Sequence, residues 1–197
     1  ALCYGDSQRK LGVALKRGVI QREEVIISAR VCGERRYEWN RLDYSQHSDI
    51  DYSADYAIAN AEKQLELLGI DYFDALSIHD PRDIDPTLGK GGTLSGLLKL
   101  KDRGLTRNLG YAMNPHTFHL KVIETGELDV LLTFNDFNLF GQTAAEQVIP
   151  AAAERDIGVL NGWSIKRGLL TGIDLSGKDP NNEEVKRATR MRQWCLE

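Results

Sequence analysis

Strand-length and helix-length patterns alternate along this chain from one end to the other, and this alternation restricts its fold more than any other feature. Five short runs have the length of strands: residues 25–29, 74–78, 108–112, 130–134 and 158–161. Each run is almost continuously apolar or β-branched, which is typical of strands buried on both faces of a parallel sheet. The runs therefore predict a five-stranded parallel sheet.

Segments with helical spacing lie before, between and after these runs. One ends at Leu68, directly before Gly69, a residue that commonly terminates helices. Another begins at Pro115 and stops before Gly126, with proline in the first turn and glycine after the last. The predicted helices span residues 7–16, 53–68, 93–103, 115–125, 143–156 and 183–195. Because helices and strands alternate, we expect right-handed crossovers between parallel neighbours.

The size and charge of the chain are those of an ordinary globular protein. It has 197 residues, of which 42% are apolar, and 25 basic against 29 acidic residues give a formal net charge of −4. This mild acidity argues against a general affinity for nucleic acid or an anionic membrane surface. No apolar run reaches the roughly 18 residues that a membrane span requires, so membrane insertion is not expected.

The cysteines and the first residue bear on the compartment. Cys3, Cys32 and Cys195 form no C-x-x-C pair, which argues against a disulfide framework or a common structural zinc site. We therefore expect the cytoplasm or another reducing intracellular compartment. The chain opens at Ala1 without a signal peptide, and an organelle-targeting segment that has been removed is the alternative.

Two α/β architectures fit this alternation, and the glycines favour one of them. A doubly wound dinucleotide-binding fold should carry G-x-G-x-x-G at its first strand–helix turn, which this sequence lacks. The glycine-rich stretch at residues 89–92 also lacks the Walker pattern. It is interpreted as a loop leading into a helix cap, with a phosphate loop as the less favoured alternative.

The other architecture is the (β/α)8 barrel, which gathers polar residues from the carboxyl ends of its strands into one site. Such residues accompany all five runs: Arg30, His79–Asp80, Asn114, Asn135–Asp136 and Trp163–Ser164. The sequence thus favours a partial barrel with its site at that rim.

Motifs at five places along the chain occur together in one known family. They are Tyr4-Gly5-Asp6-Ser7-Gln8, Ile27-Ser28-Ala29-Arg30, Ser77-Ile78-His79-Asp80-Pro81, Leu109-Gly110-Tyr111-Ala112-Met113-Asn114 and Gly168-Leu169-Leu170-Thr171-Gly172. The set resembles the aldo-keto reductases, and the H-D-P form of the third motif resembles the D-threo-aldose (fucose/galactose) 1-dehydrogenase branch. The resemblance implies one domain over residues 1–197, an incomplete barrel in which the first two strands and the last are missing.

The resemblance also implies a site and a cofactor, NADP or NAD. Tyr4 takes the place of the general acid–base, His79 that of the residue that orients the carbonyl, and Arg30 that of the lysine that lowers the tyrosine pKa. Asn114 takes the place of the residue that hydrogen-bonds the nicotinamide amide. Four further residues fall where the family's backbone lies near the cofactor diphosphate: Trp163, Ser164, Ile165 and Gly168.

Each of these residues has a plainer interpretation when it is taken alone. Tyr4 is then an aromatic at a helix start, His79 a core or rim histidine, and Asn114 a helix N-cap, a role compatible with cofactor binding. His116 and His119 are spaced i,i+3 but have no third ligand nearby in the sequence, so no metal site is expected.

The sequence departs from the family pattern at several positions. The family aspartate would lie two positions before Ala1, and Arg30 replaces the lysine with a planar fork in place of a compact ammonium. Phe134 falls near a position that often holds glutamine, and Gly162 falls where an aromatic ring commonly stacks on nicotinamide. Two open apolar edges are expected, at residues 25–29 and 158–161, and such edges invite pairing with a partner chain.

Two functions are compatible with these features. The first is an NAD(P)-dependent oxidoreductase that acts on an aldose or another small carbonyl or alcohol and is impaired in this form. The second is a catalytically degenerate domain that serves as a structural or regulatory subunit, which the change of lysine to Arg30 and the missing strands favour. Cofactor binding with turnover would support the first function over the second.

Overall fold

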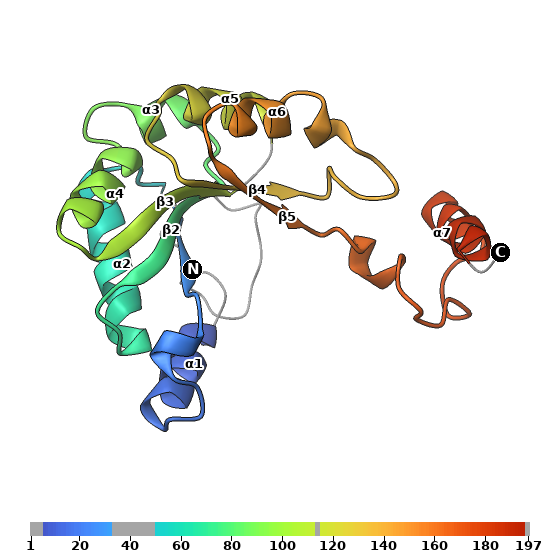
Figure 1. Ribbon diagram of the computed structural model, residues 1–197, viewed down its shortest axis with the longest axis horizontal. Coiled ribbons are helices and arrows are strands. Elements are labelled where there is room, and N and C mark those ends of the chain that lie inside the picture. Colours follow the sequence, from blue (N-terminus) through green and yellow to red (C-terminus); the bar gives the residue numbers. More distant parts are fainter. Residues whose placement is uncertain (1–5, 33–49, 113–114, 196–197) are drawn as a thin grey trace.

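The computed structural model describes residues 6–32, 50–112 and 115–195. These residues form one five-stranded sheet with β1 (Ser28–Cys32), β2 (Phe73–His79), β3 (Thr106–Ala112), β4 (Val130–Phe134) and β5 (Gly158–Gly162). The strand order is β1-β2-β3-β4-β5 and every neighbouring pair is parallel (Figure 1). The predicted parallel sheet is confirmed, and its order is that of consecutive strands in a (β/α)8 barrel.

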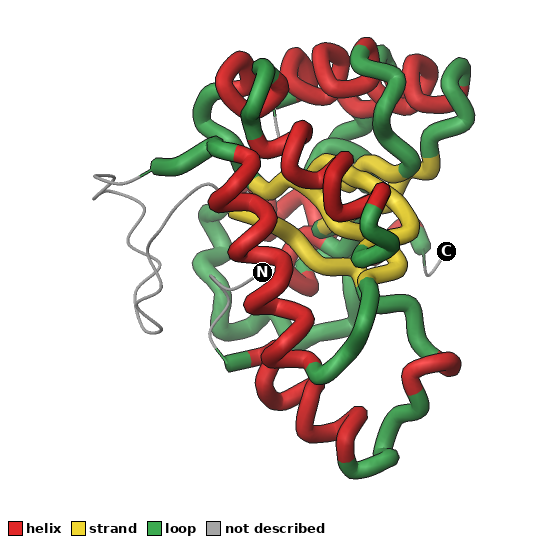
Figure 2. The backbone as a smooth tube through the Cα atoms, turned by 90° about the vertical axis from the view of Figure 1, so that its left-hand side faces the viewer, coloured by secondary structure: helices red, strands yellow, loops and turns green. Residues whose placement is uncertain are grey.

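The helices follow the strands in the predicted alternation. They are α1 (Ser7–Lys16), α2 (Ala54–Leu68), α3 (Ile84–Leu88), α4 (Thr93–Asp102), α5 (His116–Glu124), α6 (Val148–Ala153) and α7 (Glu183–Trp194), with the short 3-10 turns η2 (Arg22–Glu24), η3 (Thr143–Ala145) and η4 (Lys166–Gly168). Helices α2 to α6 lie over one side of the sheet (Figures 1 and 2), whereas α7 lies apart from it at the end of a long connection (Figure 1).

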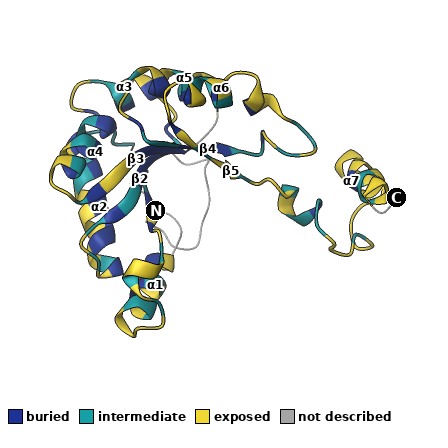
Figure 3. Ribbon diagram, viewed as in Figure 1, coloured by how far each residue is buried: buried dark blue, intermediate teal, exposed yellow. Residues whose placement is uncertain are grey.

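The hydrophobic core fills the layer between the sheet and these helices. Residues at alternate strand positions are fully buried there, and they meet the apolar stripes of α2, α4 and α5; the buried set includes Leu76, Ile78, Leu109, Leu131, Ala61, Leu97, Leu100 and Val122. Burial is concentrated in this layer, and α7 is mostly exposed (Figure 3). The opposite, inner face of the sheet carries the intervening strand residues.

The largest differences from the predicted boundaries are at the start of β1 and within the helix expected at residues 143–156. Strand β1 begins at Ser28, three residues later than expected, because the Asp74 carboxylate accepts the Ile27 N–H at 2.8 Å in place of a strand carbonyl. Arg30 therefore lies in the middle of β1 and not at its end. The helix expected at residues 143–156 is divided into η3 and α6, since Pro150 has no N–H with which to continue a helix from Thr143.

Strands β1 and β5 are the two edges of the sheet formed by the described residues. Both expected edges are therefore present. Leu160 on β5 is 51% exposed, and Ile26, just before β1, is 85% exposed. Edges of this kind are ready templates for pairing with another strand.

A buried histidine joins α5 to the sheet. The His119 side chain is fully buried; its Nε2 lies 3.2 Å from the Leu132 carbonyl oxygen and its Nδ1 3.4 Å from that of Pro115. A neutral ring has one N–H, so it donates to only one of these carbonyls. Burial is the largest influence on its pKa and holds it below the usual value near 6.5, although the two carbonyls and Asp136 act in the opposite direction.

This histidine should make the fold sensitive to mild acid. Below the ordinary histidine pKa of about 6.5 the unfolded chain binds a proton that His119 does not bind in the folded chain. The free energy of unfolding therefore falls as the pH is lowered. One such proton limits the slope to about 1.4 kcal/mol per pH unit. Urea unfolding of the wild type and His119→Gln between neutral pH and pH about 5 measures this slope, which should be shallower in the variant. Equal slopes in the two proteins would contradict the attribution of this pH dependence to His119.

Candidate active site

Two of the three predicted catalytic residues lie on neighbouring strands of the inner face. Arg30 on β1 pairs in register with Ser77 on β2, and Cys32 pairs with His79. Arg30 and His79 are therefore on the same side of the sheet, two residues apart in register, because strand side chains alternate between faces. His79 is the last residue of β2 and is 6% exposed, with Nε2 at 3.5 Å from Oδ2 of Asp80.

The backbone turns sharply where three strands end. Asp80, Asn135 and Trp163 directly follow β2, β4 and β5, and their φ angles are +47°, +60° and +59°. Non-glycine residues rarely adopt this left-handed region, and each such residue costs about 1–3 kcal/mol. Conformations of this kind cluster at functional sites. Among the described residues, all the left-handed non-glycine residues except Asp156, which precedes β5, lie at or after the carboxyl ends of strands.

The chain after β5 forms a loop, residues 163–168, that we call the β5 loop. Three of its members, Trp163, Lys166 and Arg167, have positive φ angles without being glycine. The Trp163 ring packs at 4.6 Å from the Phe134 ring, and the Arg167 guanidinium lies 4.5 Å from the Trp163 ring centre. The predicted cofactor-binding residues Trp163, Ser164, Ile165 and Gly168 are therefore all in this one loop, at the carboxyl end of β5.

Beside the β5 loop is a cavity of about 430 Å³. Three of the side chains that line it are cationic and two are carboxylates; the lining is Trp163, Lys166, Arg167, Leu169, Lys178, Asp179, Asn182, Glu184 and Val185. The first residues of α7 are among them, with the Asn182 side chain accepting the N–H groups of Glu184 and Val185. The cations outnumber the carboxylates in this lining and the positive end of the α7 dipole adds to them, so the cavity favours an anion, although Asn182 already caps two of the helix N–H groups.

Lys166 connects three parts of this region. Its Nζ lies 3.1 Å from Oδ1 of Asn135, after β4, and 2.9 Å from Oε1 of Glu184, in the first turn of α7. The Lys166 side chain is 17% exposed and that of Glu184 is 54% exposed. Lys166 therefore holds the β5 loop between the sheet and α7.

The two histidines of α5 lie near the same edge and have separate partners. His116 Nε2 lies 2.8 Å from Oδ2 of the buried Asp136, while His119 lies between two carbonyls. Within the part of the chain that the structure describes, no group of three or more histidine, cysteine, aspartate or glutamate residues could hold a metal ion. Nor do the described residues include a helix long and apolar enough to cross a membrane.

A sequence profile of the Aldo/keto reductase family matches residues 1–196. The chain belongs to this family. Among its relatives are an L-galactose dehydrogenase from Arabidopsis thaliana, 28% identical over 93% of the chain, and a D-threo-aldose 1-dehydrogenase from a Pseudomonas species, 26% identical over 84%. The chain spans 54% of the length of each of these two relatives.

Solved structures of aldo-keto reductases share the fold. The holo form of an aldo-keto reductase from Bacillus halodurans matches with a TM-score of 0.72 at 20% identity, over 94% of this chain and 58% of that one. A glycerol dehydrogenase from Gluconobacter oxydans matches with a TM-score of 0.68 at 22% identity, over 91% of this chain and 52% of that one. The five strands described here are thus part of an aldo-keto reductase barrel.

The remaining predicted site residues of this aldo-keto reductase chain, Tyr4 and Asn114, lie outside the described residues. Sequence reasoning places the backbone of the β5 loop at the site but overlooks the side chains of Lys166, Arg167 and Glu184. Two adjacent cations in the loop that follows a strand are a signal that could have identified the first two. Glu184 lies 18 positions beyond Lys166 on another element, so no local pattern indicates it.

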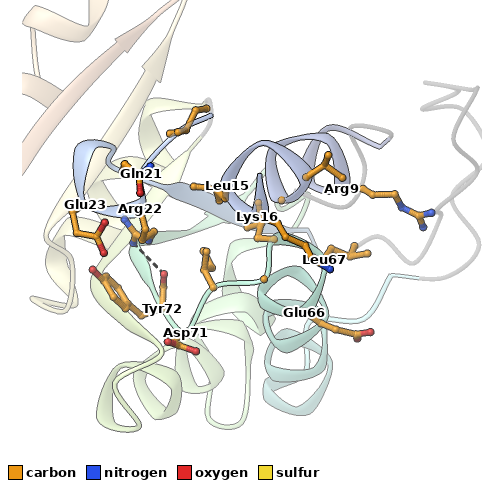
Figure 4. A pocket seen from close by; sticks show the side chains of 16 residues that line it. Arg9, Leu15, Lys16, Gln21, Arg22, Glu23, Glu66, Leu67, Asp71 and Tyr72 are labelled. Atoms are coloured by element: carbon orange, nitrogen blue, oxygen red, sulfur yellow. Dashed lines mark hydrogen bonds between the residues drawn. The ribbon is translucent and has the colours of Figure 1, made fainter. Parts of the chain in front are cut away.

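A second cavity, of about 710 Å³, lies at the opposite end of the sheet. It is bordered by α1, the end of α2 and the segments that precede β1 and β2, with Arg9, Arg22, Glu66 and Tyr72 among its lining residues (Figure 4). The amino ends of barrel strands serve stability, whereas sites form at the carboxyl ends. We therefore assign the candidate site of this aldo-keto reductase to the carboxyl edge.

Proposed function

We propose that this chain belongs to an NAD(P)-dependent oxidoreductase that interconverts the hydroxyl and carbonyl forms of an aldose or another small substrate. Membership of the family and the names of its aldose dehydrogenase relatives support this proposal. The observation that carries it is the placement of Arg30 and His79 on the same face of adjacent strands, with His79 at the carboxyl edge. That placement brings a permanently charged guanidinium and a buried imidazole to one side of the sheet.

Tyr4 is proposed as the general acid–base. A phenol has an ordinary pKa of about 10, which is too high for proton exchange near neutral pH. The positive charge of Arg30 would favour the tyrosinate and so lower that pKa. Arg30 offers a planar fork in place of a compact ammonium, so we expect it to act less effectively than a lysine. The His79 imidazole would donate a hydrogen bond that orients the substrate oxygen.

The residues at the edge fit a dinucleotide. When bound, the nicotinamide supplies hydride chemistry. The cationic side chains Lys166, Arg167 and Lys178 surround a cavity large enough for phosphate groups, and the ring pair Phe134–Trp163 offers an aromatic surface beside it. We propose that the backbone of Trp163, Ser164, Ile165 and Gly168 lies along the diphosphate and that Asn114 hydrogen-bonds the nicotinamide amide.

The proposal is tested by assaying aldose oxidation with NAD⁺ and NADP⁺, followed by nicotinamide absorbance. L-Galactose and D-threo-aldoses are the first substrates, since the relatives' names point to them. The assay uses residues 1–197 and, if the gene encodes a longer protein, that full-length protein as well. We expect weak turnover, a loss of about tenfold or more in His79→Gln and a gain of about tenfold in Arg30→Lys.

Arg103→Lys is the matched control. Arg103 follows α4 and pairs with Glu62 at 2.6 Å on the exposed surface, so the same exchange there should leave kcat/KM unchanged. Turnover that is insensitive to both His79→Gln and Arg30→Lys would contradict the assigned roles. Absence of any cofactor binding would contradict the proposed function itself.

A further inference from the structure

The β5 loop has a strained backbone conformation, and it is supported by contacts to residues outside the loop. Trp163, Lys166 and Arg167 all have φ between +49° and +59°. Left-handed non-glycine residues persist only where surrounding contacts over-determine the backbone. The Lys166 side chain supplies such contacts, to Asn135 on one side and Glu184 on the other.

The two partners of Lys166 differ in kind. Asn135 is neutral and lies directly after β4, so its contact ties the loop to the sheet. Glu184 is charged, lies in the first turn of α7 and is more than half exposed. An ion pair with an exposed partner is worth little and is screened by salt. Another anion can therefore replace the Glu184 carboxylate on Lys166 at small cost. The Asn135 amide is neutral, so an entering anion need not displace it.

Helix α7 can lose this contact without losing its place. The Arg192 guanidinium, near its last turn, donates to the carbonyl oxygens of Ile173 at 2.7 Å and Leu169 at 3.1 Å. Ala188 in its middle is fully buried, and the Arg187 guanidinium lies 5.0 Å from the Phe140 ring centre. The helix is thus fixed along its length, and the bond between Glu184 and Lys166 is a separate contact at its first turn.

We propose that Glu184 is a positioning residue that occupies Lys166 until a phosphate group of the cofactor takes its place. This rests on the proposed function, because the cavity beside the loop is the proposed diphosphate site. With Glu184 and Asp179 in place, two carboxylates oppose the three cations of the cavity. Displacement of Glu184 leaves Lys166 free for the entering anion and lets the strained loop adjust around it.

Four variants test whether a phosphate group replaces Glu184 on Lys166. Glu184→Gln removes the charge and the ion pair, whereas Glu184→Asp keeps the charge but shortens its reach to Lys166. Glu183→Gln is the matched control, since Glu183 is in the same first turn but pairs with Lys186 at 2.7 Å. Lys166→Gln removes the proposed phosphate ligand itself. The probe is inorganic pyrophosphate, titrated by calorimetry onto the full chain.

We expect Glu184→Gln to bind pyrophosphate about two- to fivefold more tightly than Glu183→Gln, because an exposed ion pair shifts an equilibrium by up to about that factor. Lys166→Gln should bind it most weakly. A merely structural role for Glu184 predicts the opposite sign, since losing a supporting contact weakens binding. The difference should vanish at high salt, where the pair is screened.

Hydrogen exchange gives a second readout that needs no ligand. The amides of Lys166, Gly168, Leu169, Leu170 and Thr171 are bonded within the loop and the turn after it. Glu184→Gln and Glu184→Asp should both raise their exchange rates about two- to fivefold above those of Glu183→Gln.

The outcomes separate this inference from the proposed function. Faster hydrogen exchange in the Glu184 variants, without pyrophosphate binding in any variant, would show that Glu184 stabilises the loop. The same result would overturn the displacement of Glu184 by phosphate and, with it, the proposed cofactor site. Binding that is equal in Glu184→Gln and Glu183→Gln, with equal exchange, would overturn the inference and leave the cofactor site standing. Wild-type behaviour of Glu184→Asp in both readouts would also overturn it, because charge alone would then account for any change in Glu184→Gln.

Discussion

Replacement of Asp74 by alanine is expected to lower the free energy of unfolding by about 3 kcal/mol. Its carboxylate, at the start of β2, lies 2.7 Å from Nη2 of Arg22 and accepts the Ile27 N–H, and Arg107 lies 3.4 Å away. Asp74 and Arg22 are only 15% and 17% exposed. Removing Asp74 would take from the largely buried Arg22 guanidinium its charged partner, leaving it only backbone carbonyls, and would leave the Ile27 N–H without its acceptor. Such losses cost about 1–3 kcal/mol each.

The same carboxylate should make stability depend on acid. Burial by itself raises the pKa of Asp74, but the Ile27 N–H and the charges of Arg22 and Arg107 outweigh it and hold the pKa below its ordinary value of 3.8. A depressed carboxylate pKa stabilises the fold above the unfolded-state value, and this contribution is lost as pH falls through the folded-state value. The loss of this contribution should therefore occur below pH about 4, whereas the effect of His119 begins near pH 6.5.

Urea unfolding at neutral pH and at pH about 3 measures both effects. Glu62→Ala is the control, since Glu62 makes an equally short pair with Arg103, at 2.6 Å, but both partners are about half exposed. That variant should lose less than about 1 kcal/mol. If Asp74→Ala and Glu62→Ala were equally stable, the cluster around Asp74 would not be what fixes the start of β1.

A second large effect is expected from Gly92→Ala, at the start of α4. A Cβ at this position would lie 2.1 Å from the Pro86 carbonyl oxygen, 2.8 Å from that of Thr87 and 2.9 Å from that of Gly89. All three are backbone atoms that cannot rotate away. Forcing the turn apart should cost about 2–3 kcal/mol, in the range typical of overpacking.

Its neighbour provides the comparison. Gly91 has φ +77°, but a Cβ added there would meet no atom within 4 Å, so Gly91→Ala should cost only about 1 kcal/mol of left-handed strain. Thermal and urea unfolding of both variants measure the difference. Equal losses would show that φ and not close packing requires glycine here. Gly92 is the N-cap residue of α4, which agrees with the interpretation of residues 89–92 as a loop leading into a helix cap.

The sequence predicts an element well where its own residues decide it. Helix α1 and strand β4 have the predicted bounds, and α2 begins after its Ser53 cap and ends at Gly69, which has φ +65°. The predicted start of β1 is wrong because its first ladder position is decided by Asp74, a side chain 47 residues away from Ile27. Helix α3 is not predicted because its five residues show too little periodicity to stand out.

The candidate site divides in the same way. Strict alternation along parallel strands is enough to bring Arg30 and His79 to one face, so their relation could be predicted. The Lys166–Glu184 and His116–Asp136 pairs could not, because each joins residues about 20 positions apart through connections whose course no local pattern specifies. Backbone strain at Asp80, Asn135 and Trp163 is likewise visible only in three dimensions.

Each described strand after β1 pairs with the strand that leaves the ribosome just before it. Each crossover unit can therefore dock onto strands already made, and nascent strands do not wait for partners from the far end of the chain. The paired residues are 20 to 47 positions apart in sequence, much closer than the two ends of the chain, and shorter separations lower the entropy cost of pairing. Among the described strands, the edge that awaits its next neighbour therefore moves from β1 towards β5 as the chain is made.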